Sequence, residues 1–224
     1  MKIDLEVSEP VNFSSGDHQH LVHTAAIKDF IMKVFVVLSI QLFITAVIIS
    51  IFVFCKPVRK WVIAKPWFLY ALLDIRRQVP ANYILLAFFT ILEGLLLGSL
   101  SVFYRAEEIL WAAGATTVVT LVLTLFALQT KWDFTLLSGV MFVFTSVLLI
   151  YGIIALVIRS YWLHLVYSAL GTLLFSIYLV MDVQMMVGGH YHYEINPEEY
   201  IFAALNIYVD IISLFIFILD LIGR

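Results

Sequence analysis

Apolar residues fill six long stretches of the chain, and each stretch is long enough to cross a membrane as an α-helix. The first, residues 34–55, has about 22 residues and would extend about 33 Å, against roughly 30 Å of hydrocarbon in a bilayer. The other five are 83–103, 109–128, 134–158, 162–187 and 200–222. Short polar breaks separate them, which favours antiparallel neighbours in one helical bundle. The pattern predicts an all-α polytopic membrane protein with six full spans.

The segment between the first two spans has a different pattern. Four basic residues between positions 56 and 65 precede only seven apolar ones, 67–73, which give about 11 Å of helix. That length covers a third of the hydrocarbon layer, so we expect residues 56–82 to lie at the interface or to re-enter part way. Trp61 and Trp67 are suited to anchor such a segment at the headgroup level.

Composition supports a membrane protein and excludes other classes. Apolar residues make up 63% of the chain and charged residues 13%, against roughly 45–50% and about 25% in soluble domains. The lipid bilayer is therefore the main partner. A net charge of −3 and the lack of binding motifs argue against nucleic acid. Residues 1–29 are polar and are expected to form a disordered tail, which leaves residues 30–224 as the transmembrane helical domain.

Four acidic residues lie inside the predicted spans, where an Asp costs roughly 2.5–3.5 kcal/mol near the centre. Asp220 lies within a turn of the end of the last span and can reach the headgroups, so we expect a structural role for it. Glu93 stands beside the pair Gly94 and Gly98, whose small faces allow another helix to approach closely. Glu93 therefore either hydrogen-bonds a neighbouring helix or lines a pore.

Asp182 and Asp210 lie in consecutive spans, which are expected to be antiparallel neighbours. In one interpretation each acid is separately satisfied, for example by Tyr178, Asn206 or an arginine. In the other, the two carboxyl groups form a coupled pair that shares a proton. Spacing alone leaves both interpretations open.

Candidate catalytic and metal-binding residues are few. His190, His192 and Glu194 resemble a weak metal pattern, but we expect a solvated loop and no metal site there. The single cysteine, Cys55, excludes an intramolecular disulfide. No hydrolase or phosphate-binding motif is present, so the sequence does not indicate an enzyme, and no cofactor is expected. An intramembrane hydrolase would need a metal at His190, His192 and an acid.

Several runs of the sequence resemble the transmembrane Bax inhibitor motif family, in its Lifeguard branch, over residues 28–224. The most specific run is Asn196-Pro-Glu-Glu-Tyr-Ile-Phe-Ala-Ala-Leu-Asn-Ile-Tyr-Val-Asp-Ile-Ile212. Supporting runs are Phe30-Ile-Met-Lys-Val-Phe35, Ser39-Ile-Gln-Leu42, Leu128-Gln-Thr-Lys-Trp-Asp-Phe-Thr135, Tyr167-Ser-Ala-Leu-Gly-Thr-Leu-Leu-Phe175 and Met181-Asp-Val-Gln184. The resemblance implies a Bax-inhibitor-like seven-helix bundle with the last helix at its centre.

The resemblance also implies a function and a site. Family members are associated with protection from apoptosis and with a pH-sensitive calcium leak from intracellular stores. A pair of aspartates in the last two helices gates that leak, and the matching positions here are Asp182 and Asp210. Glu93 and Asn206 are then candidate pore-lining residues. Calcium would be the permeating or regulating ion, calcium ions and protons would be partners, and calcium homeostasis would be the process.

The resemblance implies an endoplasmic reticulum or Golgi membrane, with the endolysosomal or plasma membrane as alternatives. Apoptosis-regulatory membrane proteins are candidate partners. A different function remains open: a non-conducting membrane adaptor that modulates death-receptor or stress signalling through helix contacts.

Two departures from the family pattern stand out. The long Pro, Gly and Tyr-rich tail common in this branch is absent, so partner interactions of such tails do not carry over. The second helix is also truncated, at half or less of the apolar length expected between Pro66 and Arg76. Arg76 and Arg77 resemble the basic latch on the aspartate pair, and the truncation puts their placement in question.

Overall fold

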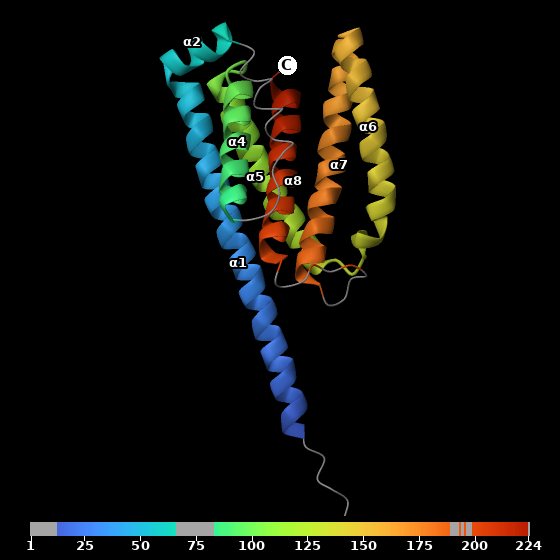
Figure 1. Cartoon of the computed structure of the whole chain (residues 1–224). Coiled ribbons are helices and arrows are strands. Elements are labelled where there is room, and N and C mark those ends of the chain that lie inside the picture. Colours follow the sequence, from blue (N-terminus) through green and yellow to red (C-terminus); the bar gives the residue numbers. More distant parts are fainter. Residues whose placement is uncertain (1–12, 66–82, 189–192, 194, 196–198, 224) are drawn as a thin grey trace, which may run out of the picture.

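The computed structural model describes residues 13–65, 83–188, 193, 195 and 199–223, and helices account for nearly all of them (Figure 1). There is no β-strand in this part of the chain. In chain order, the elements are α1 (Phe13–Phe54), α2 (Lys56–Ala64), α4 (Tyr83–Ser101), α5 (Ala106–Gln129), the short 3-10 helix η1 (Phe134–Leu137), α6 (Ser138–Ile158), α7 (Tyr161–Val187) and α8 (Tyr200–Ile222).

The described helices confirm a polytopic membrane bundle. Five are long and apolar enough to span: α5, α7, α8, the part of α1 over Ile27–Phe54, and η1 with α6 over Phe134–Ile158. The sixth predicted span corresponds to α4, whose apolar part over Leu86–Ser101 is shorter. Helix α8 has the bounds that the sequence predicts. Helix α1 begins at Phe13 and so includes residues assigned to the polar tail, while the division of domains at residue 29 stays a prediction.

The segment expected not to span, residues 56–82, begins with α2, which has nine residues and would extend about 14 Å. Helices α1 and α4, before and after this segment, run parallel, because Gln41, Ile48 and Phe52 of α1 meet Thr90, Gly94 and Gly98 of α4 in the same order. The end of α1 and the start of α4 therefore lie on opposite sides of the bundle, which contradicts the expectation that the segment does not cross.

Helix α2 lies across one end of the bundle rather than along it (Figure 1). Its one buried residue, Val62, packs against Phe52 at the end of α1 and Val102 at the end of α4. Trp61 is 45% exposed on α2, as an interfacial anchor requires. Arg76 and Arg77 lie outside the described residues.

Helix α8 occupies the centre of the bundle. It contacts α1, α4, α5 and α7. In the apolar 18-residue stretch of α8, 56% of the residues are buried within the protein. The corresponding share is between 17% and 28% for the other four spans. Side chains of α8 are therefore surrounded mostly by protein, whereas the outer helices expose more of their side chains to lipid. The central position expected of the last helix is confirmed.

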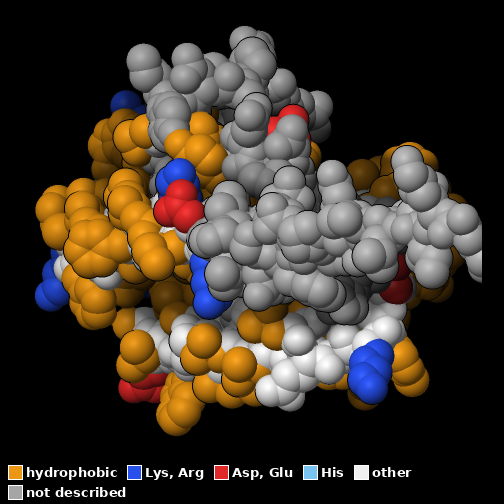
Figure 2. Space-filling view, turned by 90° about the horizontal axis from the view of Figure 1, so that it is seen from below, with side chains coloured by type: hydrophobic (Ala, Val, Ile, Leu, Met, Phe, Trp, Pro, Cys, Tyr) orange, Lys and Arg blue, Asp and Glu red, His pale blue; other side chains and the backbone are white. Residues whose placement is uncertain are grey.

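The outer surface is suited to lipid. Figure 2 shows the bundle from its lower end, where hydrophobic side chains predominate among the coloured atoms and charged side chains are few and scattered. On α6, for example, Phe142, Leu156 and Val157 are each about 70% exposed or more. Such exposure would be costly in water, but it matches a hydrocarbon surrounding.

The small residues Gly94 and Gly98 of α4 do bring another helix close, and that helix is α1. A Cβ atom built on Gly94 would lie 2.7 Å from Cδ1 of Ile48, and one on Gly98 would lie 2.7 Å from the ring of Phe52. A larger residue at Gly98 would require the Phe52 ring to move, and one at Gly94 would require the end of the Ile48 side chain to move, because side chains of α1 pack directly on the backbone of α4.

Candidate functional site

Asp182 and Asp210 meet between the last two helices. Asp182 lies about one and a half turns before the end of α7, and Asp210 lies about three turns after the start of α8. Their side chains are hydrogen-bonded to each other. Both are buried, with exposed fractions of 7% and 5%. The structure thus brings together the two acids whose pairing the sequence left open.

A hydrogen bond between two carboxyl groups has a chemical requirement. A carboxylate only accepts, so one group of the pair must carry a proton in order to donate. Oδ2 of Asp210 is buried and has no hydrogen-bond partner among the described residues. An uncharged carboxyl group at one of the two positions would meet this requirement and would also lower the cost of burying the pair.

Two residues were considered as separate hydrogen-bond partners of the acids, Tyr178 and Asn206. The hydroxyl of Tyr178 shares a 2.9 Å hydrogen bond with Oγ1 of Thr145 on α6. Asn206 lies on α8 about one turn before Asp210 and is only partly buried. The described residues show no hydrogen bond from Tyr178 to either acid.

Gln184, two residues after Asp182, fixes the segment between α5 and η1. Its side chain is fully buried, its Nε2 donates to the carbonyl of Trp132 at 2.8 Å, and its Oε1 accepts from the backbone N–H of Phe134 at 2.8 Å. The side-chain amide of Gln184 therefore uses both its donor and its acceptor to bind the backbone of one short segment. The sequence offered only a weak signal for this role, a polar uncharged residue near the end of an apolar run.

A second buried polar cluster lies on the other side of α8, between α1 and α4. Gln41 of α1 donates from Nε2 to Oγ1 of Thr90 at 3.0 Å, and Oε1 of Gln41 is buried without a partner in the described part of the chain. Oγ1 of Thr45 and the hydroxyl of Tyr208 share a 2.8 Å hydrogen bond. Tyr208 and Asp210 are two residues apart on a helix and so point to nearly opposite sides.

Glu93 lies about one turn after Thr90 on α4 and is 1% exposed. It is therefore enclosed by protein and does not face lipid, which is compatible with both of the roles considered for it. Asn206, the other candidate pore-lining residue, faces a partly open environment on α8.

Asp220, at the far end of α8, is half-buried and is bound to neighbouring elements. It accepts a hydrogen bond from Oγ of Ser168 on α7 and, at 3.4 Å, one from the hydroxyl of Tyr104. The described residues include no group of three or more His, Cys, Asp and Glu side chains able to hold a metal ion. His190, His192 and Glu194 lie outside the described residues.

The fold and the site define a class of protein: a multi-span helical membrane protein with two buried carboxyl groups between its last two helices. Comparison with known proteins gives the family. The profile of the family described as "Inhibitor of apoptosis-promoting Bax1" matches residues 27–224. The chain belongs to this Bax inhibitor family.

Individual relatives support the same assignment. The chain is 37% identical to "Protein lifeguard 3" of Homo sapiens, covering 97% of the chain and 74% of the relative. It is 39% identical to "Protein lifeguard 3" of Mus musculus, covering 87% of the chain and 68% of the relative. It is 34% identical to "Bax inhibitor 1" of Schizosaccharomyces pombe, covering 87% of the chain and 76% of the relative. The human alignment runs over 235 positions, more than the 224 residues of this chain, so that relative has residues which this chain lacks.

Proposed function

We propose that the protein is a calcium leak channel of an intracellular membrane, that the Asp182–Asp210 pair gates it in response to pH, and that the leak restrains apoptosis. The observation that carries the proposal is the hydrogen bond between two buried carboxyl groups of adjacent spanning helices. A buried acid is expensive in a membrane, and a pair of them is a typical proton-responsive element.

In the proposed closed state, the shared proton joins α8 to α7. A hydrogen bond that involves a charged carboxylate is short and strong, and it is stronger still where water is excluded. Because α8 also contacts α1, α4 and α5, holding it against α7 holds the whole bundle closed. Loss of the proton leaves two negative charges in contact. Their repulsion favours separation of α7 from α8 or the binding of a cation.

Calcium suits the oxygen atoms that separation would expose. Ca²⁺ takes six to eight oxygen ligands from carboxylates, amide carbonyls and water. The two carboxylates of the pair supply part of that set, and Asn206, about one turn from Asp210, adds an amide oxygen. Glu93, a buried carboxyl group on α4, stays among the proposed pore-lining residues as a second place where a cation could bind, on the opposite side of α8 from the pair.

The proposed latch involves Arg76 and Arg77, whose guanidinium groups would pair with the carboxylates in the closed state. The longer human relative is compatible with a shortened second helix in this chain. With seven apolar residues where a full span requires about 20, the latch would reach the pair less reliably. We therefore expect a leakier closed state than a full-length second helix would give.

The proposed membrane is that of the endoplasmic reticulum or the Golgi, with the endolysosomal and plasma membranes as alternatives. The role in apoptosis rests on the family description, which names inhibition of an apoptosis-promoting protein. Membrane proteins that regulate apoptosis are then proposed partners, and the leak would act by lowering the calcium content of the store.

The experiment is calcium flux from liposomes that contain the purified protein, measured between about pH 6 and 8. We expect flux to rise with pH in the wild type, and to lose most of its pH dependence in Asp182→Asn and in Asp210→Asn. Glu107→Gln, which removes an exposed acid at the start of α5, is the matched control and should keep the wild-type profile.

Two results would contradict the proposal. One is no protein-dependent flux at any pH, which would favour the adaptor that works through helix contacts. The other is an unchanged pH profile in both aspartate variants while they remain folded, which would remove the gate from this pair.

A further inference from the structure

Helix α2 carries a group of basic side chains at the end of the bundle where α1 and α4 end. Lys56, Arg59 and Lys60 are spaced three and four residues apart, so they share one face of the helix. Both lysines are exposed, and Arg59 is half-buried. Lys65, which follows the helix, is exposed, and its Nζ lies 5.6 Å from the ring centre of Trp61. Four cations therefore stand within ten residues of the chain.

The position of α2 places these cations at the level of the lipid headgroups. The spanning part of α1 ends at Phe54, and α2 begins two residues later and lies across the end of the bundle (Figure 1). Val62 holds it there through its contacts with the ends of α1 and α4. Trp61 and Ile63 are 45% and 53% exposed beside the cations. A helix with exposed apolar and basic side chains is suited to the boundary between headgroups and hydrocarbon.

The four cations of α2 have no acidic partner in the described part of the chain. The nearest acids in other elements of this end, Glu107 and Glu108 at the start of α5, act on Arg105 instead. Glu108 forms an ion pair of 2.6 Å with Nε of Arg105, and Glu107 interacts electrostatically with the same guanidinium. Arg159, between α6 and α7, is a further exposed cation. Positions 66–73, which follow α2, contain no charged residue.

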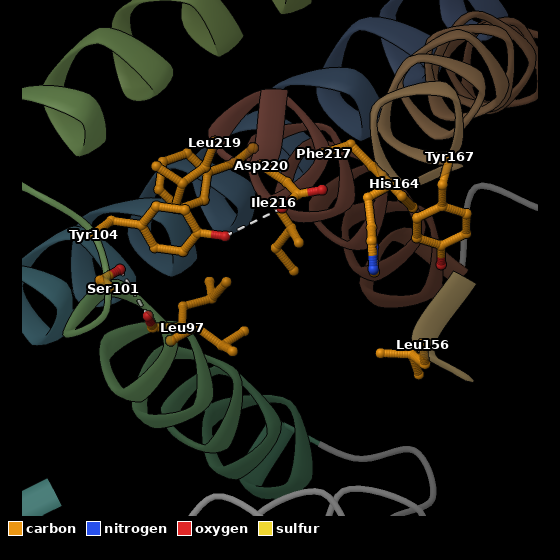
Figure 3. A pocket seen from close by; sticks show the side chains of 12 residues that line it. Leu97, Ser101, Tyr104, Leu156, His164, Tyr167, Ile216, Phe217, Leu219 and Asp220 are labelled. Carbon is orange, nitrogen blue, oxygen red and sulfur yellow. Dashed lines mark hydrogen bonds between the residues drawn. The ribbon is translucent and has the colours of Figure 1, made fainter. Parts of the chain in front are cut away.

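Asp220 and His164 complete the charged and basic side chains described at this end. Both line a cavity of about 320 Å³ between α4, α6, α7 and α8 in Figure 3, where Asp220 accepts a hydrogen bond from Tyr104. The described wall of that cavity includes no residue of α2. Protonation of His164 would add positive charge, so it would not oppose the binding of an anion. Three acids thus stand against six Lys and Arg side chains among the described residues of this end: Glu107, Glu108 and Asp220 against Lys56, Arg59, Lys60, Lys65, Arg105 and Arg159.

We propose that α2 is a docking surface for anionic phospholipids of the membrane leaflet at this end of the bundle. The headgroup oxygens would accept hydrogen bonds from Lys56, Arg59 and Lys60, and the acyl chains would continue past Trp61 and Ile63 into the hydrocarbon. A soluble anion could use the cations only. The exposed apolar side chains next to the cations therefore favour a lipid as the occupant.

The test uses the full chain in detergent micelles to which single lipids are added. A ligand that binds the folded state raises the midpoint of thermal unfolding as its concentration increases. The probes are anionic dioleoyl-phosphatidylserine, zwitterionic dioleoyl-phosphatidylcholine with the same chains, and glycerophosphoserine, which has the anionic headgroup without chains. We expect stabilisation by phosphatidylserine alone. Raising the salt concentration from about 0.1 M to 1 M should weaken it, because the Debye length falls from about 10 Å to 3 Å.

Lys56→Gln combined with Lys60→Gln should weaken the apparent affinity for phosphatidylserine roughly 10- to 30-fold. Both side chains are exposed, so these changes should leave the fold intact. The matched control combines Lys28→Gln with Lys131→Gln, which removes two exposed lysines at the other end of the bundle and changes the net charge equally. We expect this control to bind phosphatidylserine as the wild type does.

Three results would overturn the proposal. Equal losses of affinity in the two double variants would mean that the lipid responds to total charge and not to α2. Equal stabilisation by phosphatidylcholine would mean that the acyl chains alone are recognised. Equal stabilisation by glycerophosphoserine would assign the cations of α2 to a soluble anion.

Discussion

Thr45 of α1 and Tyr208 of α8 share a hydrogen bond of 2.8 Å between side chains 163 residues apart in the chain. Both residues are buried, and Tyr208 is fully enclosed. This bond holds α8 against α1 on nearly the opposite side from Asp210. The central helix is therefore fixed by polar contacts on two sides, to α7 through the acid pair and to α1 through Tyr208.

The first prediction follows from that bond. Tyr208→Phe removes the hydroxyl and leaves Oγ1 of Thr45 without its partner, so we expect a loss of about 1–2 kcal/mol in the free energy of unfolding. Adding Thr45→Val should cost less than the sum of the two single changes, with a coupling of about 1 kcal/mol. The measurement is unfolding in mixed micelles. If the loss of unfolding free energy in the double variant equals the sum of the losses in the two single variants, the bond contributes nothing to stability.

The second prediction concerns the close contact of α4 with α1. Gly98→Ala places a methyl group 2.7 Å from the ring of Phe52, so we expect it to destabilise the fold by about 1–3 kcal/mol. Gly114→Ala is the matched control, because nothing lies within 4 Å of its Cβ position on α5. That change should be neutral or stabilising by up to about 1 kcal/mol. If both variants unfold alike, the contact at Gly98 is looser than described.

The third prediction tests Gln184 as the support of the loop between α5 and η1. Gln184→Leu keeps the approximate size of the side chain but removes its hydrogen bonds to the backbone of Trp132 and Phe134. We expect faster backbone hydrogen exchange at residues 130–135, with no change in the outer half of α6. Gln129→Leu, exposed at the end of α5, is the control. Unchanged exchange at the loop in Gln184→Leu would exclude this role.

The hydrophobic pattern predicted the spans well because membrane helices are set by length and by the cost of polar groups in lipid. The bounds of α8 and the end of α7 at Val187 follow directly from where polar residues resume. Helix α1 was less predictable. It begins at Phe13 and includes polar residues before its apolar part. Hydropathy does not indicate where a helix begins when that part of the helix lies outside the membrane.

The site was predictable in its residues but not in its contacts. Two buried acids in consecutive spans marked Asp182 and Asp210, yet their pairing depends on the depth and rotation of each helix, which packing decides. For the same reason the sequence did not assign Asp220 to Ser168 or Gln184 to the loop. Each of these contacts joins helices through side chains whose facing direction no spacing within one helix determines.

The fourth prediction addresses the short second helix. Insertion of about 18 apolar residues after Leu73 would give the crossing segment the apolar length of a full span and would hold Arg76 and Arg77 at its far end more reliably. We expect lower calcium flux at acidic pH and a steeper pH profile than in the natural chain. An insertion of 18 Gly and Ser residues, which cannot span, is the control. Equal flux in the two insertions would argue against the latch.

The last prediction is that Asp182 and Asp210 act as one unit in stability as well as in flux. Replacing one acid by leucine leaves the other carboxyl buried without the partner of its hydrogen bond, so each single change should cost about 2–4 kcal/mol. The double change to leucine removes both polar groups and leaves an apolar contact between α7 and α8. Its cost should therefore be smaller than the sum of the single costs by about 1–3 kcal/mol. Asp182→Leu combined with Glu107→Gln should be additive, because Glu107 is exposed at the start of α5 and Asp182 is buried near the end of α7. Unfolding of all variants at one fixed pH is the measurement. Additive losses for the Asp182 and Asp210 changes would mean that two independent acids stand at the interface, and a gate that depends on a shared proton would then have no physical basis.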